Sequence, residues 1–246
     1  MLNERRWIVI AFVLLCLACA SAQTQAGRAA RRAGRAVSRR QQQANKPASF
    51  TYGDVTLSGF ARITGRLGVI AEAVGPGTTV DLVDQAHKAT ARLQAEKITV
   101  YWTQGSTQAQ RIEASGSVRY SGVQPAPGGE QKVRGEGSRA VFVRAENKIT
   151  LYGPATFYAE QPVPDTHTVQ TVAGTSNEVI YDAAKQVLTF NGNVNATITM
   201  PDTLEGPARI SGAESIALEL AERPYTFNVK LGSVQFSPKQ AQPKPK

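Results

Sequence analysis

A strand pattern that returns about every 40 residues constrains the fold more than any other feature of this sequence. It is first clear at residues 96–100, and it returns at 139–143, 177–181 and 214–218. Measured from Ile98, the spacings are 43, 38 and 37 residues. Within each copy, apolar and polar residues alternate, which is typical of a β-strand with one buried face. Four copies in phase indicate a chain built from repeated supersecondary units.

A second strand type carries a glycine at its centre. Its copies lie at 112–118, 149–155 and 188–194, with an upstream copy at 55–61. The central glycines are Gly59, Gly116, Gly153 and Gly192. Because glycine weakens a strand, its return at one position predicts a bulge or a sharp bend there in every repeat. Each repeat is therefore expected to be two strands joined by a short turn, such as 182–185.

The fold class predicted from this pattern is all-β. One segment is ambiguous, because Leu82, Ala86, Ala89 and Leu93 share helical spacing, but the β-favouring run 98–101 favours strand for at least its second half. Two-strand units of about 37–43 residues cannot bury their apolar faces alone. We therefore expect them to stack, or to fold two sheets against each other, as a sandwich or jelly roll with an apolar interior.

The two ends of the chain differ from the repeats in composition. Arg5 and Arg6 precede an apolar run, so residues 1–22 are predicted to be a signal peptide, with a retained anchor as the alternative. A lipoprotein leader ending at Cys19 is a weaker interpretation, because Cys16 stands where leucine or valine is expected. Any of these leaders would place the rest of the chain outside the cytoplasm. Residues 23–49 form a basic arm with no acidic residue, which is expected to be disordered.

The basic arm is predicted to be either a solvated tail or a tether to anionic lipid headgroups, where each basic residue near the surface contributes about 1 kcal/mol. Nucleic-acid binding is disfavoured, because no aromatic residue is interleaved for base stacking. A second basic tail, rich in proline, follows at 237–246. The formal charge of +9 therefore comes from the ends and says nothing about the domain between them. The residues expected to act as the tether are Arg28, Arg31, Arg32, Arg35, Arg39 and Arg40.

Side chains with metal-binding or redox chemistry are sparse. Cys16 and Cys19 both lie in the leader, which excludes disulfides and thiolate metal sites from the rest of the chain. His167 is expected to be a surface residue of a Pro-bounded loop. His87 follows two aspartates at three-residue steps, which would make a weak row of metal ligands only on a helix. No metal site and no cofactor are predicted.

The carboxylates at the repeated strands have a simpler explanation than acid/base catalysis. Glu96, Glu178 and Glu214 fall near the starts of three copies, and alternation is expected to point them outward. Surface charge of this kind keeps sheet edges from pairing with other chains. No nucleophile in a Gly-rich elbow and no phosphate loop is present. The sequence therefore predicts no catalytic residue and no enzyme activity.

Four segments of the repeats resemble a known family. Residues 93–100, 172–181, 188–194 and 208–216 are similar to the OstA-like repeats of the lipopolysaccharide transport proteins LptA and LptC. The resemblance extends over about residues 50–236. It implies a twisted β-jellyroll, open along one side, whose apolar groove shields lipid acyl chains. It also implies a periplasmic protein, soluble or anchored in the inner membrane, that joins itself or other Lpt-type proteins end to end. The arginine-rich arm and an irregular segment at 65–77 depart from the family pattern.

A groove can carry a lipid without any chemistry, because each methylene removed from water contributes about 0.8 kcal/mol. The lining residues are expected among the apolar members of the repeated strands. They are Ile98, Val100, Val118, Val141, Val143, Leu151, Phe157, Val179, Tyr181, Phe190, Val194, Ile216 and Leu218. The same positions would be plain core if the sheets closed completely, so a structural or adhesive envelope protein with a filled interior is the alternative. A β-repeat enzyme acting on envelope polymers would need clustered carboxylates, and none is evident.

Overall fold

The structure, a computed structural model, describes residues 48–85, 88–164, 166, 168–221 and 225–239. By its internal contacts the chain divides into two units, Met1–Pro47 and Ala48–Lys246, and only the second is described. The described residues all lie in the second unit, and they are almost entirely β-strand. No helix among them is long and apolar enough to cross a membrane. The signal peptide and nearly all of the basic arm, with every tether arginine, lie outside the described residues.

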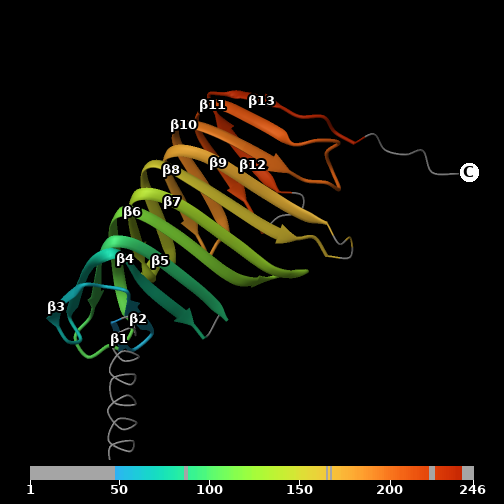
Figure 1. Ribbon diagram of the computed structural model, residues 1–246. Helices are drawn as coiled ribbons and strands as arrows, with labels where there is room; N and C mark the ends of the chain where they lie inside the picture. The colour runs from blue at the N-terminus through green and yellow to red at the C-terminus, as the bar shows by residue number, and fades with distance from the viewer. Residues whose placement is uncertain (1–47, 86–87, 165, 167, 222–224, 240–246) are drawn as a thin grey trace, which may run out of the picture. The chain divides into compact units, whose positions relative to one another are not determined.

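The strands form one antiparallel sheet of 13 strands in which each long strand pairs with its neighbours along the chain (Figure 1). A single turn of 3-10 helix, Arg144–Glu146, joins β7 to β8. The strands are β1 (Ser49–Tyr52), β2 (Val55–Ser58), β3 (Arg62–Arg66), β4 (Ile70–Asp84), β5 (Ala89–Trp102), β6 (Ala109–Ala126), β7 (Gly129–Val143), β8 (Lys148–Pro162), β9 (Val169–Asp182), β10 (Val187–Thr199), β11 (Ala208–Glu219), β12 (Thr226–Lys230) and β13 (Ser233–Gln235). The all-β prediction is confirmed, and the ambiguous segment is strand on both sides of its turn.

A line of irregularities runs across the middle of the long strands. The pairing register shifts between Val74 and Thr78 in β4, and shifts recur at matching places in every pair up to β10 and β11. We call this line the crease. It divides each long strand into two halves, and we call the two resulting parts of the sheet wing A and wing B. Wing A contains 70–74, 97–102, 109–115, 139–143, 148–152, 178–182, 187–191 and 215–219, and wing B contains 78–84, 89–95, 118–126, 129–136, 155–162, 169–175, 195–199 and 208–210.

The repeated glycines lie on the crease. Gly116, Gly153 and Gly192 have φ angles of 79°, 91° and 74°, which L side chains rarely adopt. Gly116 and Gly192 are followed by Ser117 and Asn193, which are also left-handed. Consecutive left-handed residues interrupt the ladder as a bulge and turn the strand sharply. The predicted bends at these three glycines are therefore present.

Gly59 differs from the other three. It has a φ angle of 71° but follows the end of β2, so 55–61 is not one bent strand. Instead β2 pairs with wing B of β4, and β3 pairs with wing A of β4. The upstream copy is thus a strand interrupted at the crease. The segment 65–77, which departs from the family pattern, forms the end of β3, a tight turn, the first half of β4 and the crease residues 75–77.

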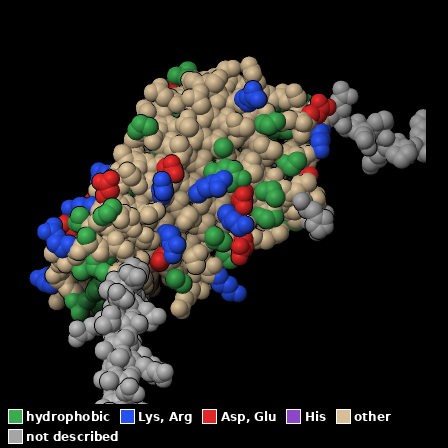
Figure 2. Space-filling view, in the orientation of Figure 1, with side chains coloured by type: hydrophobic (Ala, Val, Ile, Leu, Met, Phe, Trp, Pro, Cys, Tyr) green, Lys and Arg blue, Asp and Glu red, His purple; other side chains and the backbone are tan. Residues whose placement is uncertain are grey.

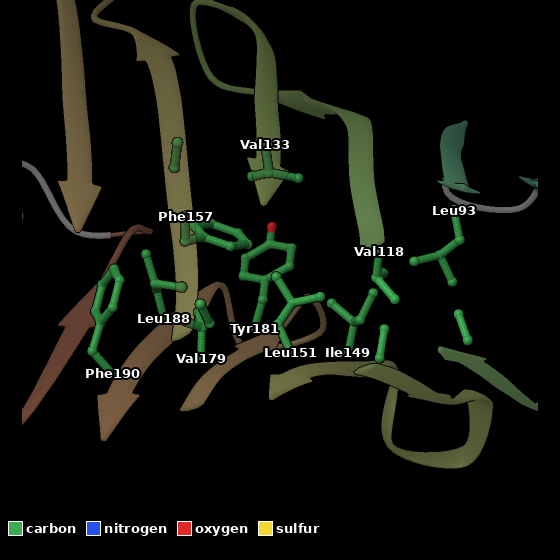
Figure 3. Close-up of a cluster of buried hydrophobic side chains, with 14 of the residues drawn as sticks. Leu93, Val118, Val133, Ile149, Leu151, Phe157, Val179, Tyr181, Leu188 and Phe190 are labelled. Carbon is green, nitrogen blue, oxygen red and sulfur yellow. The ribbon is translucent and has the colours of Figure 1, made fainter. Parts of the chain in front are cut away.

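The core lies between the wings. Apolar side chains of alternate residues point inward from both wings, and most of them are fully buried. Figure 3 shows the two layers, with Val133 and Phe157 of wing B facing Leu151, Val179 and Tyr181 of wing A. The architecture is therefore one sheet folded on itself rather than two separate sheets, which is the jelly-roll form of the prediction.

Candidate ligand-binding interior

The inner face of each wing is a set of straight rows, because residues paired across antiparallel strands share a face. A row beside the crease in wing A runs through Ala73, Ile98, Ala114, Ala140, Leu151, Val179, Phe190 and Ile216. The facing row in wing B runs through Val80, Leu93, Tyr120, Gly135, Phe157, Gly174, Ala196 and Ile210. Both rows cross every strand from β4 to β11, so the interior is a continuous apolar band along the sheet.

The two rows interlock. A methyl group on Gly135 would come within 2.5 Å of Leu151 Cδ1, and one on Gly174 within 2.7 Å of Phe190 Cε1. The glycines of wing B thus provide the space into which large side chains of wing A project. In this closed form the band is filled by the protein's own side chains.

Most of the predicted lining residues lie in this interior. Eleven of them belong to the buried core: Ile98, Val100, Val118, Leu151, Phe157, Val179, Tyr181, Phe190, Val194, Ile216 and Leu218. They come from both wings and from the crease, and the fold brings them together as one cluster.

Val141 and Val143 are the exceptions. Val141 pairs with Glu113 and Thr150, and Val143 pairs with Arg111 and Lys148, so both lie on the opposite face of the strand from Ala140, although Val141 is itself buried there. Ala140 and Phe142 take the inner positions of β7. The prediction that these two valines line the interior was wrong. In the apolar run 140–143, alternation of apolar and polar residues cannot show which side chains point inward. The phase is fixed instead by pairing with Ala114 and Ile112 of β6.

A polar row lies at the free margin of wing B, farthest from the crease. Gln124 pairs with Gln131 and Gln161 pairs with Gln170, and the last three side chains are buried. Gln131 precedes Lys132, which pairs with Glu160, so Gln131 stands next to Gln161 in the same row. We call these four residues the glutamine row. The sequence did not predict this row, although Gln131 and Gln161 lie two residues from the inward-pointing Val133 and Ala159 and so share their face of the strand.

Tyr181 of wing A reaches across to the glutamine row. Its hydroxyl donates to Gln131 Oε1 at 3.0 Å and accepts from Gln124 Nε2 at 2.8 Å, and Gln124 Nε2 also lies 2.5 Å from Gln131 Oε1. Its ring packs 5.8 Å from that of Phe157 (Figure 3). Burial raises the pKa of Tyr181 far above the usual value of about 10, with a further rise from Tyr120. The hydroxyl is therefore neutral at physiological pH and joins the two wings.

A hollow of about 820 Å³ lies along wing B. It is lined both by outward residues and by members of the inner row of that wing, among them Tyr120, Gly174 and Ile210. It crosses β6 to β11, with small residues such as Ala173 and Thr175 along it and three arginines beside them. Arg134 stacks over the Tyr158 ring at 4.3 Å, and Arg119 lies 3.6 Å from Glu136. Of the predicted lining residues only Phe157 borders this hollow. Figure 2 shows charges of both signs interspersed over the visible face, without a single-sign patch.

Among the described residues, no three His, Cys, Asp or Glu side chains come together as metal ligands. Both histidines lie outside the described residues. Glu96 and Glu214 are exposed, as expected, and Glu178 is half-buried where it accepts a hydrogen bond of 2.8 Å from Asn191 Nδ2. The carboxylates are thus spread along the outer face in contacts with neighbouring strands.

Comparison with known proteins bears on the repeats directly. Residues 85–167 match the family described as "LptA/(LptD N-terminal domain) LPS transport protein". The OstA-like resemblance is confirmed. The OstA-like match covers β5 to β8, about a third of the chain. No curated protein matches the chain. The solved structures that match the chain include that of LptH from Pseudomonas aeruginosa, described as the LptA homologous periplasmic component of the conserved lipopolysaccharide transport device. It is 12% identical, with a TM-score of 0.40 over 57% of this chain and 86% of that chain.

Proposed function

We propose that this protein is a non-catalytic lipid carrier of the lipopolysaccharide transport type, which shields acyl chains between its two wings. The observation that carries the proposal is the continuous apolar band that crosses every strand from β4 to β11. An acyl chain laid along this band would meet apolar side chains over its whole length. Removal of each methylene from water contributes about 0.8 kcal/mol, so burial alone could hold such a chain.

The protein's own side chains fill the interior, and this determines how an acyl chain would enter it. Phe190, Leu151 and Val179 have no exposed surface, so acyl chains must displace contacts between the wings. The crease is continuous backbone and cannot open, whereas the free margins are joined through side chains. We therefore propose that the wings separate at the margin beside Tyr181 and close again over the ligand.

A photo-crosslinking experiment tests this. Benzoylphenylalanine at Phe190 lies in the inner row, and the same group at Thr189 lies on the outer face of the same strand. Lipopolysaccharide is expected to crosslink at position 190 and not at 189. Equal labelling at both positions, or labelling at 189 alone, would contradict an interior carrier.

The alternative, an envelope scaffold with a permanently closed core, is favoured by the burial of nearly all side chains of the inner rows. The same experiment separates the two functions, because a permanently closed core would give no lipid crosslink at either position.

End-to-end assembly is the second part of the proposal. β1 pairs only with β2, and β12 only with β11, so each end of the described sheet offers a strand edge. Leu67 near the first end and Leu231 and Phe236 near the second are large apolar side chains that are mostly exposed. Strand addition between copies, or onto a related Lpt-type protein, would cover both features and extend the apolar band.

We place this carrier in the periplasm, and we propose that the basic arm rests on anionic lipid. Deletion of residues 24–47 should weaken binding to anionic vesicles, and more so at low salt, where charges are less screened. Equal vesicle binding by both forms would refute the tether.

A further inference from the structure

The glutamine row is an unusual feature of an otherwise apolar interior. Burying an amide costs free energy unless its donors and acceptor are satisfied. Gln131 is fully buried, and its Nε2 has no hydrogen-bond partner. The adjacent Oε1 is approached by both Tyr181 and Gln124. The site therefore contains an unused donor and a crowded acceptor, side by side.

The hydrogen bonds between Tyr181 and the two glutamines form only while the wings are closed. If the wings separate, Tyr181 withdraws from the row, and Gln131 Oε1 and Gln124 Nε2 both lose a partner. The bond between Gln124 Nε2 and Gln131 Oε1 lies within wing B and remains, but each atom then has one bonding position open, in addition to the unused N–H of Gln131. The ligand that satisfies them must bring polar groups to a point directly beside the apolar band.

The geometry points to a specific ligand chemistry: we propose that the glutamine row and Tyr181 bind the amide linkage that joins an acyl chain to its headgroup. This inference rests on the proposed carrier function. An amide N–H would donate to Gln131 Oε1, and its C=O would accept from the Nε2 of Gln131 or Gln124. The chain would continue from there toward Phe157 and Leu151. An ether-type oxygen can accept from an Nε2 group but offers no donor, so the open position on Gln131 Oε1 stays unsatisfied.

Two amphiphiles of equal chain length test the site: N-dodecanoylglucosamine, with an amide linkage, and dodecyl β-glucoside, with a glycosidic oxygen that accepts hydrogen bonds but donates none. Calorimetric titration of the full chain below the micelle concentrations is expected to show about tenfold tighter binding of the amide, the effect of about 1.4 kcal/mol from hydrogen bonding. Gln131→Leu and Tyr181→Phe should abolish this preference while the glucoside still binds. Gln108→Leu, in an exposed loop, is the matched control and should retain the preference.

Circular dichroism checks that each variant folds. If Gln131→Leu does not fold, Gln124→Leu at the half-buried end of the row takes its place. Binding of neither amphiphile by the wild-type chain would overturn the carrier function itself. Equal binding of the two, or a preference that survives the glutamine and tyrosine variants, would overturn the amide site alone.

Discussion

At the scale of single residues, the interior depends on a few side chains that cross from one wing to the other. Tyr181 is the clearest, because it combines ring packing on Phe157 with hydrogen bonds to two glutamines. Its environment suits only the neutral phenol. That preference makes the stability of the fold depend on pH in a definite direction.

We predict that the protein loses stability as pH rises above about 10, the usual pKa of tyrosine. Above that pH the unfolded chain releases the proton of Tyr181, while the folded chain keeps it because burial raises the pKa. The unfolded state then binds fewer protons, so the free energy of unfolding falls by up to about 1.4 kcal/mol per pH unit for this residue. Urea unfolding at pH 8 to 11 measures the slope.

Tyr181→Phe should lower stability near neutral pH by about 1–2 kcal/mol and flatten the alkaline slope. Some slope should remain, because burial also raises the pKa of Tyr120. Phe157→Leu, which disturbs the same packing without removing a phenol, should lower stability equally at every pH. An unchanged slope in Tyr181→Phe would show that its hydroxyl does not titrate as described.

At the scale of strands, the sequence predicted that the strands with a central glycine bend at the crease. It did not predict how the other strands bend there. Glycine at one phase of successive repeats predicted bends at Gly116, Gly153 and Gly192, and each is present. Other strands bend without that signal: β9 crosses the crease at Ser176 and Asn177, with no glycine. These strands bend because they pair with a bent neighbour. The pattern of residues within one strand does not indicate such a bend. The phase of 140–143 and the inward position of the glutamines depend on the same partner strands.

The bend glycines should be sensitive to substitution for reasons of backbone conformation. At Gly212 the φ angle is 65°, and a methyl group added there would meet no atom within 4 Å, so Gly212→Ala isolates the cost of the backbone conformation. We expect a loss of about 1 kcal/mol, seen as a lower urea midpoint with the same m-value. Gly206→Ala, where the space is equally open and φ is ordinary, is the control and should change stability little. Equal effects at both positions would contradict a strained bend.

At the scale of the whole sheet, the described fold has two unpaired ends, and assembly should depend on them. We predict that the weight-average mass in sedimentation equilibrium rises with concentration for the wild-type chain. The double variant Leu231→Glu, Phe236→Glu should shift the chain toward monomer, because it places charge where apolar surface would be buried. Val169→Glu, an exposed apolar position at the start of β9 and away from both terminal strands, is the control and should assemble like the wild type. A mass that is constant with concentration in the wild type would rule out self-assembly.

From β5 to β10, pairing in this sheet links each strand only to those beside it in sequence. A hairpin could therefore be duplicated or deleted with new contacts made only at the two joints, as in other linear repeat folds. The length of the sheet would then increase or decrease with the number of hairpins. Gain or loss of one hairpin in the gene would change the distance that a single copy can span.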